Sequence, residues 1–234
     1  MLPVATPNDL LRAALTADPA RPLLTFYDDA TGERTELSVR TFENWVAKTA
    51  NLLQDELAAT AGSRLALALP VHWQAAVWMQ AAWALGMEVV PGLSGDVVVT
   101  TPDRLEGLSG DVVSLSLRPA LVAATTPAPP LPAGVLDGDT EVLAHGDRFV
   151  PYAPPAADAA ALTVGGRTWS LAELGALAAR GSGARVLVSE ALDTVDTVSS
   201  ALLVPLASGG STVLVRNADP ALLERRRETE RVTG

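Results

Sequence analysis

The segment RLALALPVHWQAAVWMQAAWALGMEVVPG, residues 64–92, decides the fold class. It opens with the run RLALALP, which is typical of a strand buried on both faces in the interior of a parallel sheet. The run HWQAAVWMQAAWALG is apolar almost all round, so it predicts a deeply buried helix that ends at Gly86. The short strand MEVVPG follows. This strand–helix–strand order predicts an α/β fold.

The same alternation continues on both sides of this segment. It predicts a first helix capped by Asn8 or Asp9, and a helix over residues 39–58 capped by Ser38. Pro205 should end or kink the helix expected over residues 194–207. The remaining expected elements are a hairpin of LLTFYDD and ERTELS, strands DVVVTT, DVVSLSL, ALTV, RTWS, ARVLVSE and STVLVRN, a helical turn over residues 103–108, and helices from residue 171 and over residues 219–232. Together they predict an α/β fold of layered, largely parallel sheets with flanking helices.

Proline divides the chain into three regions. Residues 1–124 form a first α/β region, residues 125–158 a proline-rich connector, and residues 159–234 a second α/β region. The stretch TTPAPPLPAG in the connector predicts an extended chain. The Asp137-Gly138 pair within VLDGDTEVLA predicts a hairpin turn. We expect the two α/β regions to pack as one compact unit.

The amino-acid composition limits the classes of binding partner and of chemistry that we expect. The formal net charge is −10, which disfavours binding to nucleic acid and to anionic membranes, and the apolar runs are too short for membrane insertion. The chain has no cysteine, which excludes disulfides and thiolate metal sites and fits a cytoplasmic protein. Lys48 is the only lysine, so chemistry that needs a lysine has one candidate position.

The stretch ALTVGGRTWSLAEL, residues 161–174, has two interpretations. Gly165 and Gly166 between two short strands predict a tight hairpin turn, and Ser170 with Glu173 three residues later predicts a capping box that starts a helix. Glycines between a strand and a helix also occur in loops that cradle phosphate. The hairpin followed by a capped helix is the favoured interpretation.

Two longer segments carry a resemblance. ERTELSVRTFENWVAKTANLLQDEL followed by SRLALALPVHWQAAVWMQAAWALGMEVVPG, and later SGARVLVSEALDTVDTVSSALLVPLASGGSTVLVRNADPALLERRRETERVTG, resemble the N-terminal part of the adenylate-forming (AMP-binding) superfamily. That superfamily includes acyl-CoA synthetases, luciferases and nonribosomal-peptide adenylation domains. The truncated form resembles a group of actinobacterial proteins that are distantly related to AMP-binding enzymes.

The resemblance implies a phosphate loop of the form T-S-G-T-T-G-x-P-K-G at the point where only Gly165 and Gly166 stand here. A remnant loop would consist of Thr163, Gly165, Gly166, Arg167 and Thr168, with the arginine in place of the lysine, and would bind AMP or ATP. The resemblance also implies a ribose-binding acidic residue and a catalytic lysine, and both are expected beyond residue 234.

No other segment predicts catalysis or a metal site. We expect Lys48 to be solvated, His72 to cap or pack, and His145 to lie in a turn. Two histidines without cysteine do not make a three-histidine zinc site. The acidic residues Asp137, Asp139 and Glu141 lack the spacing of a calcium loop and predict a solvated turn.

We therefore expect a non-catalytic relative without a required cofactor, acting as a binding, regulatory or interaction protein. Its partner would be another protein or a second copy of the chain. The alternative is an enzyme or binding protein that holds an acyl or adenine-nucleotide ligand in a remnant pocket at the strand ends.

Overall fold

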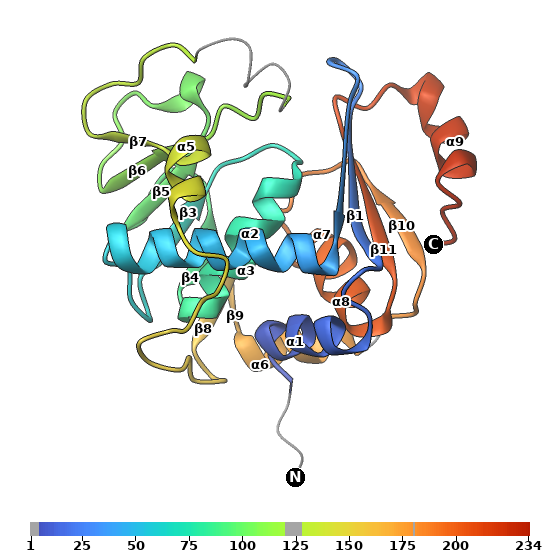
Figure 1. Ribbon diagram of the computed structural model, residues 1–234, viewed down its shortest axis with the longest axis horizontal. Helices are drawn as coiled ribbons and strands as arrows, with labels where there is room; N and C mark the ends of the chain where they lie inside the picture. Colours follow the sequence, from blue (N-terminus) through green and yellow to red (C-terminus); the bar gives the residue numbers. More distant parts are fainter. Residues whose placement is uncertain (1–4, 120–127, 180) are drawn as a thin grey trace.

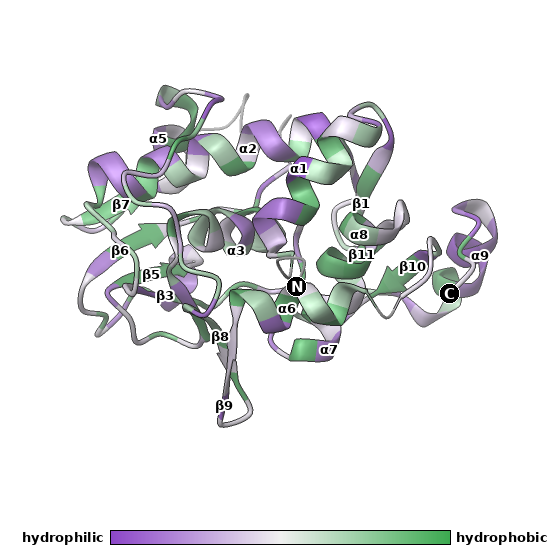
Figure 2. Ribbon diagram, turned by 90° about the horizontal axis from the view of Figure 1, so that it is seen from below, coloured by the Kyte–Doolittle hydropathy of each residue, from purple (hydrophilic) through white to green (hydrophobic). Residues whose placement is uncertain are grey.

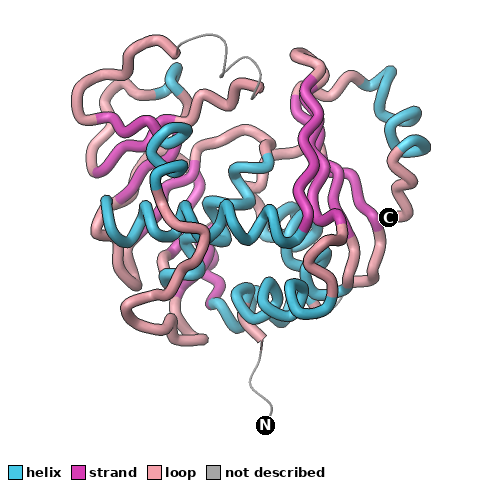
Figure 3. Tube along the Cα trace, viewed as in Figure 1, coloured by secondary structure: helices cyan, strands magenta, loops and turns pink. Residues whose placement is uncertain are grey.

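Two β-sheets with a layer of helices between them make up the fold (Figure 1). The computed structural model describes residues 5–119, 128–179 and 181–234. Figure 3 shows the strands as two separate groups, with most of the helices between them and in front of them. The layered α/β architecture predicted from the sequence is confirmed.

The larger sheet has seven strands. Neighbouring strands run parallel, except that β8 and β9 form an antiparallel hairpin at one edge. In spatial order the strands are β7 (Val135–Asp137), β6 (Asp111–Ser114), β5 (Val97–Thr100), β3 (Arg64–Leu67), β4 (Glu88–Pro91), β8 (Ala160–Val164) and β9 (Arg167–Ser170).

The smaller sheet has four strands. In spatial order they are β10 (Arg185–Val188), β11 (Ser211–Arg216), β1 (Pro22–Asp28) and β2 (Glu33–Ser38). β11 pairs parallel with both β10 and β1, and β1 forms the predicted antiparallel hairpin with β2. Each sheet therefore combines strands from before and after the proline-rich connector.

The helices lie mainly between the sheets. They are α1 (Pro7–Ala17), α2 (Val39–Asn51), α3 (Trp73–Leu85), α5 (Gly138–Ala144), α6 (Leu171–Ala178), α7 (Val195–Val198), α8 (Val204–Ser208) and α9 (Pro220–Thr229). Single π-helical turns η1 (Leu52–Glu56) and η3 (Ser199–Leu203) continue α2 and α7, and η2 (Pro102–Arg104) is a 3₁₀ turn. Among the described residues, every helix is too short or too polar to span a bilayer.

α3 is the centre of the core. Its side chains are buried on almost every side, as the apolar sequence predicts, and it ends at Gly86 with a φ of 81°. The indole nitrogen of the fully buried Trp83 donates to the carbonyl oxygen of Ala161 on β8 at 2.8 Å. Figure 2 shows the contrast between the apolar central strands and the polar helix α9. α3 is thereby tied to the sheet that it covers.

α9 is attached differently. It lies on the opposite side of the four-stranded sheet from α8 (Figures 1 and 2) and buries none of its residues. Arg226 forms an ion pair with Asp29 at 2.6 Å, and Glu230, just after the helix, contacts the hydroxyl of Tyr27 and the guanidinium of Arg185. Polar contacts at these two places hold the helix on the sheet.

Two helix starts differ from the predictions. α1 is capped by Thr6 rather than by Asn8 or Asp9, because the Thr6 side chain accepts from the backbone N–H of Asp9 while the Asp9 carboxylate accepts from that of Thr6. The hairpin predicted at Asp137-Gly138 is wrong: Asp137 ends β7, and its side chain caps α5. Residues 125–127 of the predicted extended connector lie outside the described residues.

Pro205 does not end its helix. The π-helical turn η3 comes just before it, and α8 continues to Ser208. Proline has no N–H, so the carbonyl of Ala201, four residues earlier, loses its usual helical donor. The hydroxyl of the buried Thr212 on β11 donates to this carbonyl at 2.8 Å. A cross-element hydrogen bond thus replaces the one that proline removes.

We expect Thr212→Val to lower the free energy of unfolding by about 0.5–1.5 kcal/mol, because the buried hydrogen bond to the carbonyl of Ala201 is lost. Denaturant unfolding of the variant checks this. In a Pro205→Ala background the returned N–H can bond to Ala201, so the same Thr212 substitution should cost much less. An equal cost in both backgrounds would contradict this explanation.

Candidate functional site

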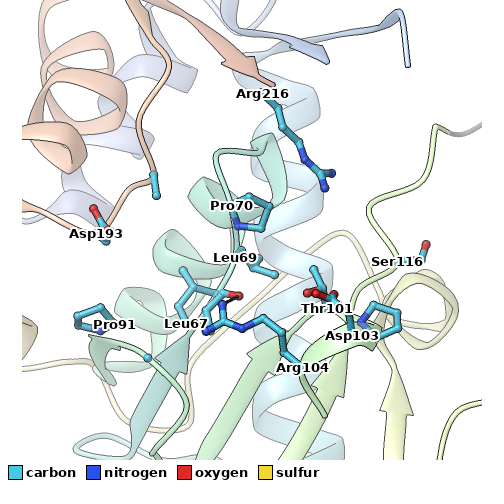
Figure 4. Close-up of a pocket in the computed structure, with 14 residues that line it drawn as sticks. Leu67, Leu69, Pro70, Pro91, Thr101, Asp103, Arg104, Ser116, Asp193 and Arg216 are labelled. Atoms are coloured by element: carbon cyan, nitrogen blue, oxygen red, sulfur yellow. Dashed lines mark hydrogen bonds between the residues drawn. The ribbon is translucent and has the colours of Figure 1, made fainter. Parts of the chain in front are cut away.

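A crevice opens at the carboxyl ends of the central strands of the seven-stranded sheet (Figure 4). Its volume is about 560 Å³, and small-molecule sites typically have roughly 300–1,000 Å³. From β3 the chain passes to β4 on one side, and the later strands β5, β6 and β7 lie on the other. The strand order thus switches at β3, and crevices at such points are the usual ligand sites of open α/β sheets.

Both sheets contribute walls to the crevice. On one side the walls are the ends of β3 and β4, the turn after β5 and Ser116 after β6; on the other they are Asp193 after β10 and Arg216 at the end of β11. Gly92, directly after β4, has a φ of 107°, a backbone conformation that favours glycine. The crevice therefore depends on the packing of the two sheets against their shared helices.

Arg104 and Arg216 bring positive charge to the crevice from the two sheets. One terminal nitrogen of Arg104 donates to the carbonyl oxygen of Ala68 at 3.3 Å. The half-buried Arg216 extends into the crevice in Figure 4, and its guanidinium has no hydrogen bond or ion pair with another described residue. A guanidinium stays charged and matches carboxylate and phosphate oxygens in pairs. The crevice therefore suits an anionic group.

Two carboxylates also line the crevice. Asp103 and Asp193 are both exposed, so they lie at its rim. A hydrogen bond from the Thr101 side chain lowers the pKa of Asp103, which is therefore ionised at neutral pH. Because like charges repel, we expect these two carboxylates to direct an anionic group away from the rim and toward the arginines.

His72 lies behind the crevice, where β3 passes into α3. The capping role predicted from the sequence is confirmed, because its Nδ1 accepts from the backbone N–H of Gln74 at 3.2 Å. Burial and, to a lesser extent, the nearby charge of Arg216 lower the pKa of His72 to about 3. Its Nε2 has no partner among the described residues. The imidazole is therefore neutral at pH 7 and packs edge-on against Phe26.

Gly165 and Gly166 form a two-residue turn between β8 and β9, with φ values of 59° and 76°. Such a turn matches the twist of an antiparallel hairpin. Ser170 and Glu173 form the predicted capping box at the start of α6. The hairpin followed by a capped helix, the favoured interpretation of this stretch, is confirmed.

The side chains predicted for a remnant phosphate loop gather in this hairpin and already contact carboxylates. The hydroxyls of Thr163 and Thr168 lie 2.6 Å apart, and Thr163 donates to Glu88 at 2.5 Å. Arg167 forms an ion pair with Glu173 at 3.1 Å. The donors that an anion would need here already bond to the carboxylates of Glu88 and Glu173. Phosphate binding by residues 163–168 stays a prediction.

The other singled-out residues have structural contacts. Lys48, expected to be solvated, donates through Nζ to the carbonyl oxygen of His145 at 2.5 Å. The solvated turn expected at Asp137 and Asp139 is wrong, because Asp137 caps α5 and Asp139 accepts from the backbone N–H of Ser116 at 2.7 Å. Within residues 5–119, 128–179 and 181–234, no group of three acidic or histidine side chains is placed to hold a metal ion.

Arg104 and Arg216 were not among the residues predicted for a site. Arg104 lies three residues after the predicted strand DVVVTT, Arg216 lies near the end of the predicted strand STVLVRN, and parallel strands end at the same edge of a sheet. An arginine at or just beyond the carboxyl end of a buried strand was therefore the available signal. It was not sufficient, because the sequence does not indicate that the ends of the two sheets face each other.

Comparison with known proteins defines the family. No family model matches the chain. A Mycobacterium tuberculosis protein described as a TIGR03089 family protein is 41% identical over 241 residues, which cover 99% of this chain and 98% of that protein. The chain belongs to the TIGR03089 family. This family member and its relative match over nearly their whole lengths.

Solved structures define the fold of this TIGR03089 family member. An acyl-CoA synthetase from Brucella canis matches 98% of the chain with a TM-score of 0.80 and 20% identity, and the N-terminal domain of FACL13 from Mycobacterium tuberculosis matches 97% with a TM-score of 0.72 and 15% identity. The chain spans 46% of the former protein and 61% of the latter. The fold is that of the N-terminal domain of adenylate-forming enzymes, as the resemblance predicts.

The buried histidine of this family member makes its stability depend on pH. The unfolded chain binds a proton at His72 below about pH 6.5, whereas the folded protein does not until about pH 3. Between these values we expect the free energy of unfolding to fall with decreasing pH, by up to about 1.4 kcal/mol per pH unit. Denaturant unfolding over this range measures the slope.

His72→Asn keeps a good helix cap and removes the titrating group. The free energy of unfolding of this variant should therefore change less with pH than that of the wild type. The control is His145→Asn, which should keep the wild-type slope. Equal slopes in the His72 variant and the wild type would count against the buried imidazole as the cause.

Proposed function

We propose that the protein is a non-catalytic relative of adenylate-forming enzymes and binds an anionic small molecule, of the acyl or adenine-nucleotide class, in the crevice between its sheets. The observation that carries the proposal is the two-residue turn at Gly165-Gly166 in a fold that otherwise keeps its layers and its strand-end crevice. The fold therefore has the strand-end crevice but lacks the phosphate loop that adenylation requires.

The β8–β9 hairpin supports the proposal that the protein does not catalyse adenylation. A loop that wraps a triphosphate needs several consecutive N–H groups turned toward the ligand, and a two-residue turn does not provide them. The only lysine, Lys48, is held by the backbone of His145. Preorganised donors supply several kcal/mol of transition-state stabilisation, about 2.7–4 kcal/mol for a single donor. Without loop and lysine, the described residues do not assemble this stabilisation.

The residues that line the crevice support the proposal that it binds an anionic small molecule. Arg104 and Arg216 converge on it from the two sheets, and Arg216 has no competing ion pair among the residues that the structure describes. The whole chain carries a net charge of −10, whereas the arginines and aspartates that line the crevice balance, so an anion is repelled less here than by the chain as a whole. The site combines a concave shape, a switch-point position and two guanidinium groups, one of them without an ion pair among the described residues.

We expect AMP to bind saturably at millimolar concentration or below, measured by isothermal titration calorimetry. Arg216→Ala should weaken binding about tenfold or more, because hydrogen bonds to charged groups contribute about 1.5–3 kcal/mol. Arg167→Ala in the hairpin is the matched control and should leave the affinity unchanged. The reverse pattern would place the ligand at the remnant loop.

We also expect no ATP–pyrophosphate exchange above a protein-free blank with a mixture of carboxylic acids. The reason is the missing set of phosphate donors around the turn. Exchange above the blank would contradict the non-catalytic assignment and favour the alternative of an enzyme that uses the crevice. A protein partner or a second copy of the chain as binding partner stays a prediction, which light scattering on the purified protein tests.

A further inference from the structure

A second cavity of about 550 Å³ adjoins the crevice. It lies between the turn after β5, the ends of β6 and β7, and residues 128–132 of the proline-rich connector. The two cavities share Pro102, Asp103 and Ser116 as lining residues. A ligand in the crevice can therefore extend past these residues into the second cavity, which we name the proline compartment.

The proline compartment has apolar walls. Leu105 comes from the segment after β5, and Pro129, Pro130, Leu131 and Pro132 form the facing wall. Proline rings are rigid, and proline-rich segments pack well against aromatic groups. Such walls fit a flat ring better than they fit a charged or strongly hydrated group.

Ser114 adds a second observation at this compartment. It lines the cavity, is only 2% exposed, and its hydroxyl has no hydrogen-bond partner among the described residues. A buried hydroxyl without a partner is unfavourable and is rare in folded proteins. A polar atom on a bound ligand would supply that partner.

The charges of the lining residues determine which end of an extended ligand lies in the proline compartment. Asp103, Glu106 and Asp137 line the proline compartment, against one cation, Arg118, whose Nε donates to the hydroxyl of Ser116. The compartment is thus net negative and repels a second anionic group, whereas Arg216 lines only the crevice. An extended ligand therefore places its anionic end at the arginines.

We propose that the ligand is an elongated anion with a flat, apolar ring, whose anionic group lies at Arg104 and Arg216 and whose ring lies in the proline compartment. This rests on the proposed function of the crevice as an anion site. It adds a chemical class for the other end of the ligand, a neutral aromatic ring, and assigns Leu131 and Ser114 to its recognition.

The test compares inorganic phosphate with 1-naphthyl phosphate by calorimetric titration of the full chain. We expect the naphthyl ester to bind about tenfold or more tightly, because its ring leaves water for the apolar walls. Leu131→Asn should remove most of this gain and leave the affinity for inorganic phosphate unchanged. Leu222→Asn, at the 39% exposed leucine of α9, is the matched control and should change neither affinity.

A second variant changes a residue of strand β6 rather than of the proline-rich connector. Ser114→Val replaces an unpaired hydroxyl by a methyl group and adds a second methyl group, which removes an unfavourable buried polar atom, so the variant should fold. Its added volume on β6 should weaken the naphthyl ester several-fold without affecting inorganic phosphate. Thermal unfolding of each variant verifies that it is folded at the temperature of the titration.

The outcomes separate the two proposals. If both probes bind equally, or if Leu131→Asn and Ser114→Val leave the preference for the ester intact, the proline compartment is not the ring site, although the crevice still binds anions. If neither probe binds to the wild type, the crevice is not an anion site and both proposals fail. A preference lost in both variants supports the compartment.

Discussion

The burial of α3 between the two sheets is the constraint on which the rest of the structure depends. The helix has no polar face, so it is stable only where other elements cover it on every side. The seven-stranded sheet covers one side, where Trp83 bonds to the carbonyl of Ala161, and α1 and α2 cover others. At the start of the helix the His72 side chain accepts from the backbone N–H of Gln74, and burial keeps the imidazole neutral at pH 7.

Most of the fold could be predicted because its determinants are local. The strand–helix–strand order around α3, the cap at Ser38, the turn at Gly165-Gly166 and the capping box from Ser170 each depend on residues close together in the chain. The Thr6 cap of α1 was missed although it is local, whereas the failure at Asp137-Gly138 depends on a distant contact. Asp137-Gly138 has the sequence of a turn, yet it starts a helix whose Asp139 accepts from the backbone of Ser116.

The candidate site was less predictable for the same reason. Arg104 and Arg216 lie in different sheets, and only the packing of those sheets brings both side chains to one crevice. The sequence instead drew attention to Thr163, Arg167 and Thr168, whose polar groups contact carboxylates in the hairpin. Local sequence therefore indicated the departure from the phosphate loop of the adenylate-forming superfamily, while the position of the positive charge required the tertiary structure.

We propose that an anion bound to this fold is held by the arginines at the strand ends and not by the amides of a phosphate loop. A crystal structure of the protein with AMP tests it most directly. We expect electron density for the phosphate within hydrogen-bonding distance of Arg104 and Arg216. An ordered phosphate held instead by the backbone amides of residues 163–168 would contradict it.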